Sequence, residues 1–314
     1  MMNIQKAAVI GCGFVGASTA FNLVQKGLFS ELVLIDANRE KAEGEAMDLS
    51  HGRPFVHSMK IYAGNYDDIS DCALIIITAG ANQKPGETRL DLVHKNVAIF
   101  KSIIPEITKR NFEGNLLIVA NPVDILTYAA LKISGYPKER VFGSGTVLDS
   151  ARFRYLLSEH LDVDSTSVHA FIIGEHGDSE LAVWSSANVS GIDIHDFCEL
   201  RGHYDHDAAM ERIYKEVRDS AYEIIERKGA TYYGVAMAVG RIAESIIRDE
   251  NSVLPVSSLM EGEYGLEDLC ISVPTLVSQK GAEQVLEIPL NESERQKLKQ
   301  SAAELKKVLE TLDL

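Results

Sequence analysis

The chain has 314 residues, 46 % of them hydrophobic and 25 % charged, which suits one large α/β unit or two domains that share a core. The formal net charge of −15 argues against nucleic acid or an anionic membrane as a partner, so an anionic substrate must be held by locally placed arginine or lysine. No apolar run approaches the ~20 residues of a membrane span, and no signal-peptide region is evident.

The first half of the chain alternates predicted strands and helices. We expect strands over residues 7–10, 31–35, 60–63, 73–77, 116–120 and 141–146, with helices over 17–26, 41–49 and 96–110. Such alternation is typical of an α/β fold with a Rossmann doubly wound parallel sheet, which binds ligands at the carboxyl ends of its strands. Four residues at such ends should therefore gather along one rim: Gly11, Asp36, Gly80 and Asn121.

A glycine-rich turn, residues 11–16, joins the first strand to the first helix. This G-x-G-x-x-G pattern is weak evidence alone, but Asp36 ends the next strand about 20 residues later, as in the dinucleotide-binding fingerprint. Gly11 allows the tight turn, Gly13 lets a pyrophosphate approach backbone N–H groups, and Gly16 brings the helix close to the sheet. The Asp36 carboxylate would accept hydrogen bonds from a ribose and repel a 2′-phosphate, which predicts NAD; the alternative is an exposed acid.

A polar loop, residues 82–89, follows another strand end on the same rim and contains Pro85-Gly86. Because binding loops are often mobile and carry functional side chains, we interpret it as a candidate lid. The alternative is an ordinary surface loop.

The second half of the chain mixes helices and strands, which predicts an α+β domain. We expect helices over 147–157, 205–226 and 232–247, strands over 167–173, 182–188, 252–260 and 270–277, and a last helix that begins at the capping pattern of residues 291–294. We expect two domains, one of residues 1–146 and one of residues 147–314.

His176 lies in Gly174-Glu175-His176-Gly177-Asp178, where a strand gives way to a loop. Histidine exchanges protons near neutral pH, so His176 is a candidate proton donor or acceptor, with a polar turn as the alternative. Asp149 and Arg152 are three residues apart on a predicted helix and should share one face. They form either a simple ion pair or part of a ligand site in which Asp149 holds a histidine.

Thr231, the histidines and the cysteines are the other residues that could carry chemistry. Thr231 stands where a glycine interrupts two helices, so its hydroxyl could cap the second helix or contact a ligand. The nine histidines lack metal-ligand spacing and the four cysteines form no CxxC pair, which predicts no metal site, reduced thiols and a cytoplasmic location.

These motifs together resemble the L-lactate dehydrogenases of the lactate/malate dehydrogenase superfamily, over essentially the whole chain and in the bacterial form activated by fructose 1,6-bisphosphate. The matching segments are residues 11–16, Asp36, 78–81, the loop 83–89, 121–124, 149–152 and 174–178.

The resemblance implies reversible reduction of pyruvate to L-lactate by NADH, the last step of lactic fermentation. His176 would be the proton donor, Asp149 would orient its imidazole, and Arg89 would polarise the substrate carbonyl. Arg152 would bind the substrate carboxylate in bidentate fashion. The implied substrate-binding set is Gln83, Arg89, Asn121, Asp124, Asp149, Arg152 and Thr231.

The resemblance also implies which residues contact NAD. They are Gly11, Gly13, Val15, Gly16, Asp36, Lys41, Tyr66, Gly80, Ala81, Ser102, Val119, Asn121 and Ser144.

The resemblance implies that Gln83 determines which substrate is preferred. Malate dehydrogenases carry arginine at the matching position to pair a second carboxylate, whereas neutral Gln83 would leave that carboxylate desolvated and unpaired. Pyruvate is therefore preferred over oxaloacetate.

Arg154 should point away from Asp149 and Arg152, and the resemblance gives it a role with His169. In bacterial members the matching positions bind fructose 1,6-bisphosphate across a subunit interface, within a homotetramer. The alternative is a surface arginine and a strand histidine without a ligand.

Two rival functions stay open at this point. One is a malate or other 2-hydroxy-acid dehydrogenase. The other is a non-catalytic NAD-binding protein, which could lose His176, Asp149, Arg152 or Arg89 without penalty, although all four are present.

Overall fold

A computed structural model describes residues 2–81, 86 and 88–314 of the chain. Its first half contains β1 (Asn3–Ile10), α1 (Phe14–Lys26), β2 (Glu31–Ile35), α2 (Arg39–His51), β3 (Lys60–Ala63), β4 (Cys72–Ile77), α3 (Arg89–Thr108), β5 (Asn115–Ile118), α4 (Val123–Ser134) and β6 (Val141–Gly143). All six predicted strands are present. Helix α3 begins seven residues earlier than predicted, and α4 was not predicted.

These six strands pair in the order β3-β2-β1-β4-β5-β6 and are parallel throughout. This is the Rossmann strand order, so the predicted doubly wound sheet is confirmed. Strand β4 is buried at all six positions because helices cover both faces of the sheet. The order reverses between β1 and β4, which places the ligand crevice at the carboxyl ends of these two strands.

The second half contains α5 (Val147–Leu161), β7 (Val168–His169), β8 (Ile172–Ile173), β9 (Leu181–Ala182), β10 (Asn188–Val189), β11 (Ile192–Asp193), α6 (Ile194–Leu200), α7 (His206–Lys228), α8 (Tyr233–Ile247), β12 (Ser252–Glu261), β13 (Glu267–Ser278), β14 (Gly281–Val285) and α9 (Glu292–Leu309). The antiparallel pair β12–β13 and the Asn291–Glu294 capping box are confirmed.

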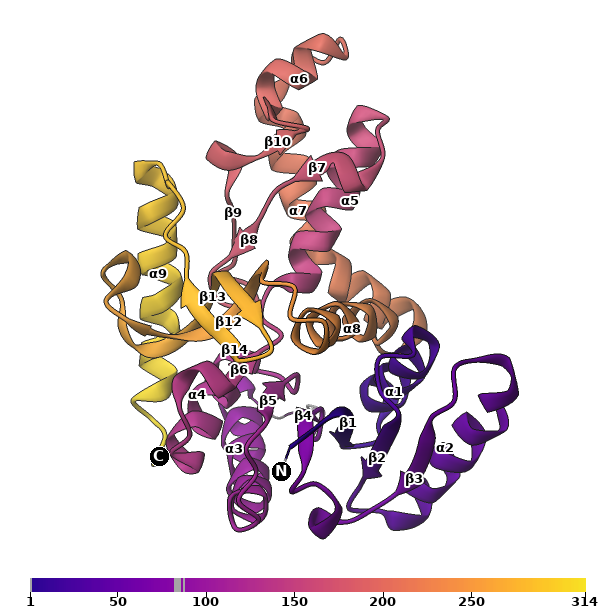
Figure 1. The fold of residues 1–314 in the computed structure, drawn as a ribbon. Helices are drawn as coiled ribbons and strands as arrows, with labels where there is room; N and C mark the ends of the chain where they lie inside the picture. The colour runs from indigo at the N-terminus through magenta and orange to yellow at the C-terminus, as the bar shows by residue number, and fades with distance from the viewer. Residues whose placement is uncertain (1, 82–85, 87) are drawn as a thin grey trace.

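Two strand predictions in this half are wrong. Residues 167–173 do not form one strand, because β7 pairs with β10 whereas β8 pairs with β9 in a separate sheet. Residues 182–188 are likewise broken by a turn of 3₁₀ helix at Trp184–Ser186. The result is a small upper lobe of short strands with α5, α6 and α7, seen above the large sheet in Figure 1.

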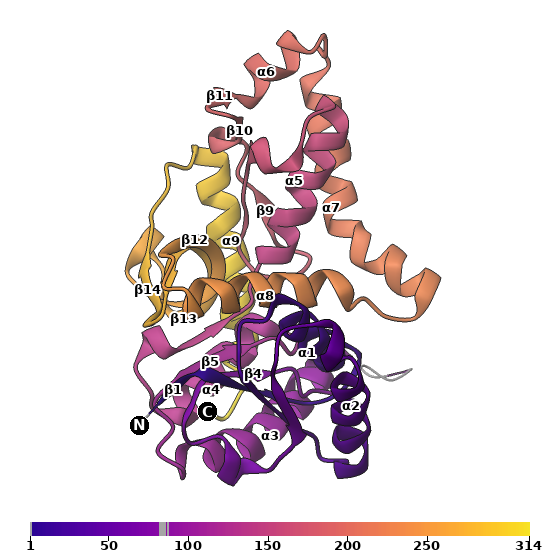
Figure 2. The same ribbon diagram turned by 45° about the vertical axis from the view of Figure 1, so that its right-hand side comes forward.

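One sheet joins the two halves. Strands β12, β13 and β14 extend the Rossmann sheet to nine strands, through an antiparallel pair between Ser257 and Gly143. Helix α8 packs against α1 and lies between the upper lobe and the Rossmann half in Figure 2. The division at residue 146 stays a prediction, since this sheet crosses it. No helix in the described ranges has the length and apolarity to span a bilayer.

Candidate active site

The glycine turn after β1 has the geometry expected of a pyrophosphate site. Gly11 has a φ of 101°, a conformation that side chains rarely adopt, and a Cβ on Gly16 would lie 1.8 Å from the Gly11 carbonyl oxygen. By contrast, a Cβ on Gly13 would meet no atom within 4 Å. Gly13 is also the N-cap of α1. The turn therefore leaves open space in front of a helix N-terminus, where a pyrophosphate fits.

Asp36 is tied to this turn rather than lying free at a strand end. Its Oδ2 accepts a hydrogen bond of 2.7 Å from the Cys12 backbone N–H, and its Oδ1 accepts one of 2.8 Å from Asn38. A carboxylate has about four acceptor positions, so two hydroxyl groups of a ribose can still be bound. The arrangement fits the adenosine half of NAD.

Asn96 joins two other parts of the rim and was missed in the sequence. Its Oδ1 accepts a hydrogen bond of 2.8 Å from the Ala81 N–H, and its Nδ2 donates one of 2.8 Å to the Asn121 carbonyl. The residue is 1 % exposed on α3. A polar residue on the buried stripe of an amphipathic helix was the available signal, because such a side chain needs partners.

Five more of the predicted NAD residues lie in different settings. Val119 and Ser144 are buried just beyond the ends of β5 and β6. Tyr66 packs under Arg110, whereas Lys41 and Ser102 are exposed on α2 and α3. Contact of these five residues with NAD stays a prediction.

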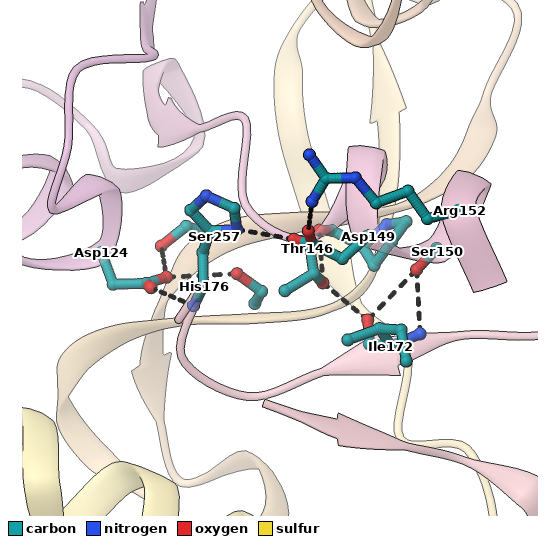
Figure 3. Close-up of polar contacts among 10 residues, drawn as sticks. Asp124, Thr146, Asp149, Ser150, Arg152, Ile172, His176 and Ser257 are labelled. Atoms are coloured by element: carbon teal, nitrogen blue, oxygen red, sulfur yellow. Dashed lines mark hydrogen bonds and ion pairs between the residues drawn. The ribbon is translucent and has the colours of Figure 1, made fainter. Parts of the chain in front are cut away.

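His176 and Asp149 form the centre of the site, as Figure 3 shows. The Nδ1 atom of His176 lies 2.6 Å from Asp149 Oδ2, and the Asp149 side chain is 2 % exposed. Asp149 Oδ1 accepts a hydrogen bond of 2.7 Å from Arg152 Nη1. The prediction that Asp149 and Arg152 share a face, with Asp149 free to hold a histidine, is confirmed. Because Nδ1 is engaged, Nε2 is the ring atom that can give a proton to a substrate.

The pKa of His176 suits a proton donor. Burial by itself lowers the pKa of a histidine, but the carboxylate of Asp149 outweighs this and raises the pKa of His176 to about 9. Burial would raise the pKa of Asp149, yet the charges of His176 and Arg152 hold it below its usual value. At neutral pH the site therefore holds an imidazolium beside a carboxylate.

Two sets of buried hydroxyls fix this geometry. The Thr146 hydroxyl donates to the Ile172 carbonyl at 2.6 Å, and Ser150 Oγ accepts from the Ile172 N–H at 2.9 Å, which pins α5 to β8 (Figure 3). Asp124 Oδ1 accepts hydrogen bonds from Ser257 and Ser272 at 2.6 and 3.1 Å. Neither set was predicted, because each joins segments far apart in the sequence.

Asp124 holds the backbone of His176. Its Oδ2 accepts a hydrogen bond of 2.8 Å from the His176 N–H, and the residue is 2 % exposed. This position places Asp124 behind His176, so a direct contact with substrate stays a prediction.

Arg89 belongs to the start of α3 rather than to a loop, which corrects the sequence interpretation. Thr88 caps this helix with a capping box to Asp91. The Arg89 guanidinium is paired with the buried Glu175 carboxylate and lies 3.7 Å from the Asp178 carboxylate. It therefore reaches the two acids on either side of His176 and Gly177. Gln83 lies outside the described residues.

Thr231 and Asn121 complete the predicted substrate-binding set. Tyr232, not Thr231, is the N-cap of α8, and no side chain caps that helix, so the capping alternative for Thr231 is wrong. Asn121 is exposed at the rim beyond β5, next to the start of α4. Both side chains are available for a ligand.

Arg154 and His169 lie together, away from Asp149 and Arg152, as predicted for Arg154. They line a pocket of about 640 Å³ between α5 and α8, and Arg241 lines it too. Burial and the neighbouring Arg241 lower the pKa of Arg154. Like charges gathered around one cavity favour an anionic ligand.

Comparisons with known proteins agree with this architecture. Residues 5–143 match the family model described as lactate/malate dehydrogenase, NAD binding domain, and residues 146–313 match lactate/malate dehydrogenase, alpha/beta C-terminal domain.

Curated relatives cover the whole chain. The L-lactate dehydrogenase of Acetivibrio thermocellus is 56 % identical over 99 % of this chain and 98 % of its own length, and L-lactate dehydrogenase 1 of Clostridium acetobutylicum is 53 % identical over 98 % of both. The ligands-bound structure of the minor L-lactate dehydrogenase from Enterococcus mundtii is 44 % identical, with a TM-score of 0.96 over 99 % of both chains. By fold, site and sequence, the chain belongs to the lactate/malate dehydrogenase family.

Proposed function

We infer that this chain is an NAD-dependent L-lactate dehydrogenase, which interconverts pyruvate and L-lactate. The observation that carries this inference is the His176–Asp149 pair, with Nδ1 and Oδ2 2.6 Å apart and Arg152 on the same carboxylate. Bacterial relatives of 52–56 % identity bear that name. NADH, when bound, supplies the hydride, so the protein needs no nucleophile of its own.

The residues of the chain have separate tasks in this reaction. Arg152 binds the pyruvate carboxylate through a planar, two-donor face that lysine lacks. Arg89 places positive charge near the developing alkoxide, and His176 gives its Nε2 proton to that oxygen as the hydride arrives. Asp149 holds the ring by Nδ1 and stabilises its charged form.

A substrate panel tests this function against its rivals. We expect NADH oxidation with pyruvate at a kcat/KM well above that with oxaloacetate or bulkier 2-oxo acids. Oxaloacetate as the best substrate would make the protein a malate dehydrogenase, and no oxidation with any 2-oxo acid would favour a non-catalytic NAD-binding protein.

Substrate choice is proposed to depend on Gln83. Replacing Gln83 with Arg should raise the oxaloacetate-to-pyruvate ratio of kcat/KM by about 10²–10³-fold, because a desolvated carboxylate gains a partner worth about 3–5 kcal/mol. Gln83→Asn is the matched control, since it adds no charge and should leave the preference for pyruvate. A ratio unchanged in Gln83→Arg would show that this residue does not set specificity.

We also propose that fructose 1,6-bisphosphate activates the enzyme at the pocket of Arg154 and His169. The support is the lining of that pocket, where the guanidinium groups of Arg154 and Arg241 supply two positive charges. We expect the effector to lower the pyruvate concentration for half-maximal rate by about 5–150-fold, a typical coupling. Arg154→Gln should lose this response, whereas Arg212→Gln, an exposed arginine on α7, should keep it. No response in the unmodified protein at neutral pH would contradict the proposal.

A homotetramer is the proposed assembly. Exposed apolar side chains gather on the packed pair α1–α8, namely Phe14, Phe21, Tyr233 and Met237. Large apolar groups left in water on adjacent helices favour self-association. Sedimentation with and without fructose 1,6-bisphosphate measures the assembly directly.

A further inference from the structure

Glu180 is a buried acid beside the catalytic pair that the reaction described above does not use. It lies directly before β9 and is 5 % exposed. Its N–H donates a hydrogen bond of 3.2 Å to the Gly177 carbonyl, and its own carbonyl accepts one from the Tyr214 hydroxyl on α7. The backbone of Glu180 is therefore held on both sides, which fixes where the carboxyl group can lie.

The carboxyl group of Glu180 is not fully hydrogen-bonded within the described part of the chain. Its Oε1 atom is buried and finds no hydrogen-bond partner among the described residues. A carboxylate oxygen of Glu180, a carboxylate oxygen of Asp149 and a ring nitrogen of His176 all lie within 4.8 Å of one another. A buried, unsatisfied polar atom costs free energy, so its position against the catalytic pair calls for an explanation.

We propose that Glu180 is a positioning residue that keeps the transferable proton on His176 as the pH rises, and so extends pyruvate reduction into alkaline solution. This inference rests on the proposed function. Glu180 does not touch the substrate in this account; it acts on His176 through charge across a short, buried distance.

The charges around Glu180 are compatible with this role. Asp149 and Arg152 face it from α5, Arg218 and Tyr214 from α7, and His176 from the preceding loop. On its other side His176 also feels the buried Asp124 of α4. The positive groups are thus balanced by acids, and the ionisation of Glu180 adds one more negative charge beside the imidazolium.

The charge that Glu180 gains as the pH rises explains why His176 keeps its proton. Burial, followed by the charge of Asp149, raises the pKa of Glu180 to about 8. Glu180 therefore gains its negative charge in mildly alkaline solution, where reduction still needs a proton on His176. Its new charge then stabilises the imidazolium, so His176 gives up its proton only at higher pH.

Replacing Glu180 with Gln tests the proposal, because glutamine keeps the size and polarity but never ionises. The alkaline limb of kcat/KM for pyruvate should move to lower pH by about 1–2 units, the shift expected when a nearby opposite charge is removed. On the plateau at lower pH the rate should stay within a few-fold of the unmodified enzyme. Glu180→Asp should retain most of the alkaline range.

Two further measurements, a titration of His176 and a binding experiment, separate this role from a structural one. The ring Cε1–H signal of His176 can be assigned by its loss in His176→Asn. With both proteins free of cofactor, this signal should titrate at lower pH in Glu180→Gln than in the unmodified protein. The affinity of the enzyme–NADH complex for oxamate, an unreactive analogue of pyruvate, should fall over the same lower pH range. Glu211→Gln removes an exposed acid from α7 and should change neither titration.

The outcomes that overturn the proposal are distinct from failure of the proposed function. An unmoved His176 titration in folded Glu180→Gln contradicts it, as does an equal loss of rate at every pH. If the unmodified protein did not reduce pyruvate, the proposed function would fail, but the titration without cofactor would still decide whether Glu180 holds the His176 proton.

Discussion

Replacing His176 with Asn should lower kcat for pyruvate reduction by about 10²–10⁴-fold, the usual contribution of a positioned general acid. Asparagine can still donate a hydrogen bond to the carbonyl oxygen but cannot deliver a proton to it. Steady-state rates of NADH oxidation measure the loss. The affinity for NADH, measured by fluorescence titration, should stay the same, because the substitution leaves the glycine turn and Asp36 unchanged.

His203→Asn is a suitable control for this variant. It also removes an imidazole, but from the upper lobe, where the His203 ring packs at a tilt against His160 with ring centroids 4.4 Å apart. Its kcat should stay near that of the unmodified enzyme. Retained turnover in His176→Asn would exclude His176 as the proton donor.

Replacing Arg152 with Lys should lower kcat/KM for pyruvate by about 10²–10³-fold, chiefly through KM. Lysine keeps the positive charge but cannot bind a carboxylate with two parallel hydrogen bonds. It also weakens the contact that holds Asp149, so the loss approaches the 3–5 kcal/mol of a broken buried ion pair. Initial rates over a range of pyruvate concentrations measure both constants.

The matched control is Arg227→Lys, on the exposed face of α7. It makes the same chemical change where no substrate is expected and should leave kcat and KM unaltered. A KM for Arg152→Lys within a few-fold of the original value would mean that Arg152 does not bind the carboxylate.

The Rossmann half could be predicted well because its signals are local. Each parallel strand is a short apolar run, and the glycine turn with Asp36 identifies both the nucleotide rim and the order of elements around it. Helix α4 was not predicted because every residue from Val123 to Leu131 is buried. No stripe of polar side chains therefore marks this segment as an amphipathic helix. Helix α3 was placed too late because its first turn carries the polar side chains that also suit a loop.

The upper lobe was harder to predict because its strands depend on distant partners. Val168–His169 pairs with β10 and Ile172–Ile173 with β9, so one apolar run serves two sheets. Nothing in residues 167–173 alone marks where one pairing ends and the next begins.

The pairing of Asp149 with Arg152 could be predicted from their spacing, whereas the hydrogen bonds that hold the site in place could not. Asp149 and Arg152 lie on one helical face, and their pairing could be expected from their separation alone. Ser150, Ser257 and Asn96 act through hydrogen bonds that span tens of residues, so only the folded chain reveals them. Glu180 is in the same position, since its burial next to Asp149 depends on how β9 returns beside β8.

The pH dependence of the reaction in both directions tests whether His176 carries the transferred proton. If the proton is carried by His176, kcat/KM for pyruvate should fall as one group loses a proton near pH 9, the value to which Asp149 raises the pKa of this histidine. The value of kcat/KM for lactate, which needs neutral His176 to accept a proton, should rise through the same pH. Profiles that are not mirror images, or an inflection that persists in His176→Asn, would contradict the assignment of His176 as the proton donor.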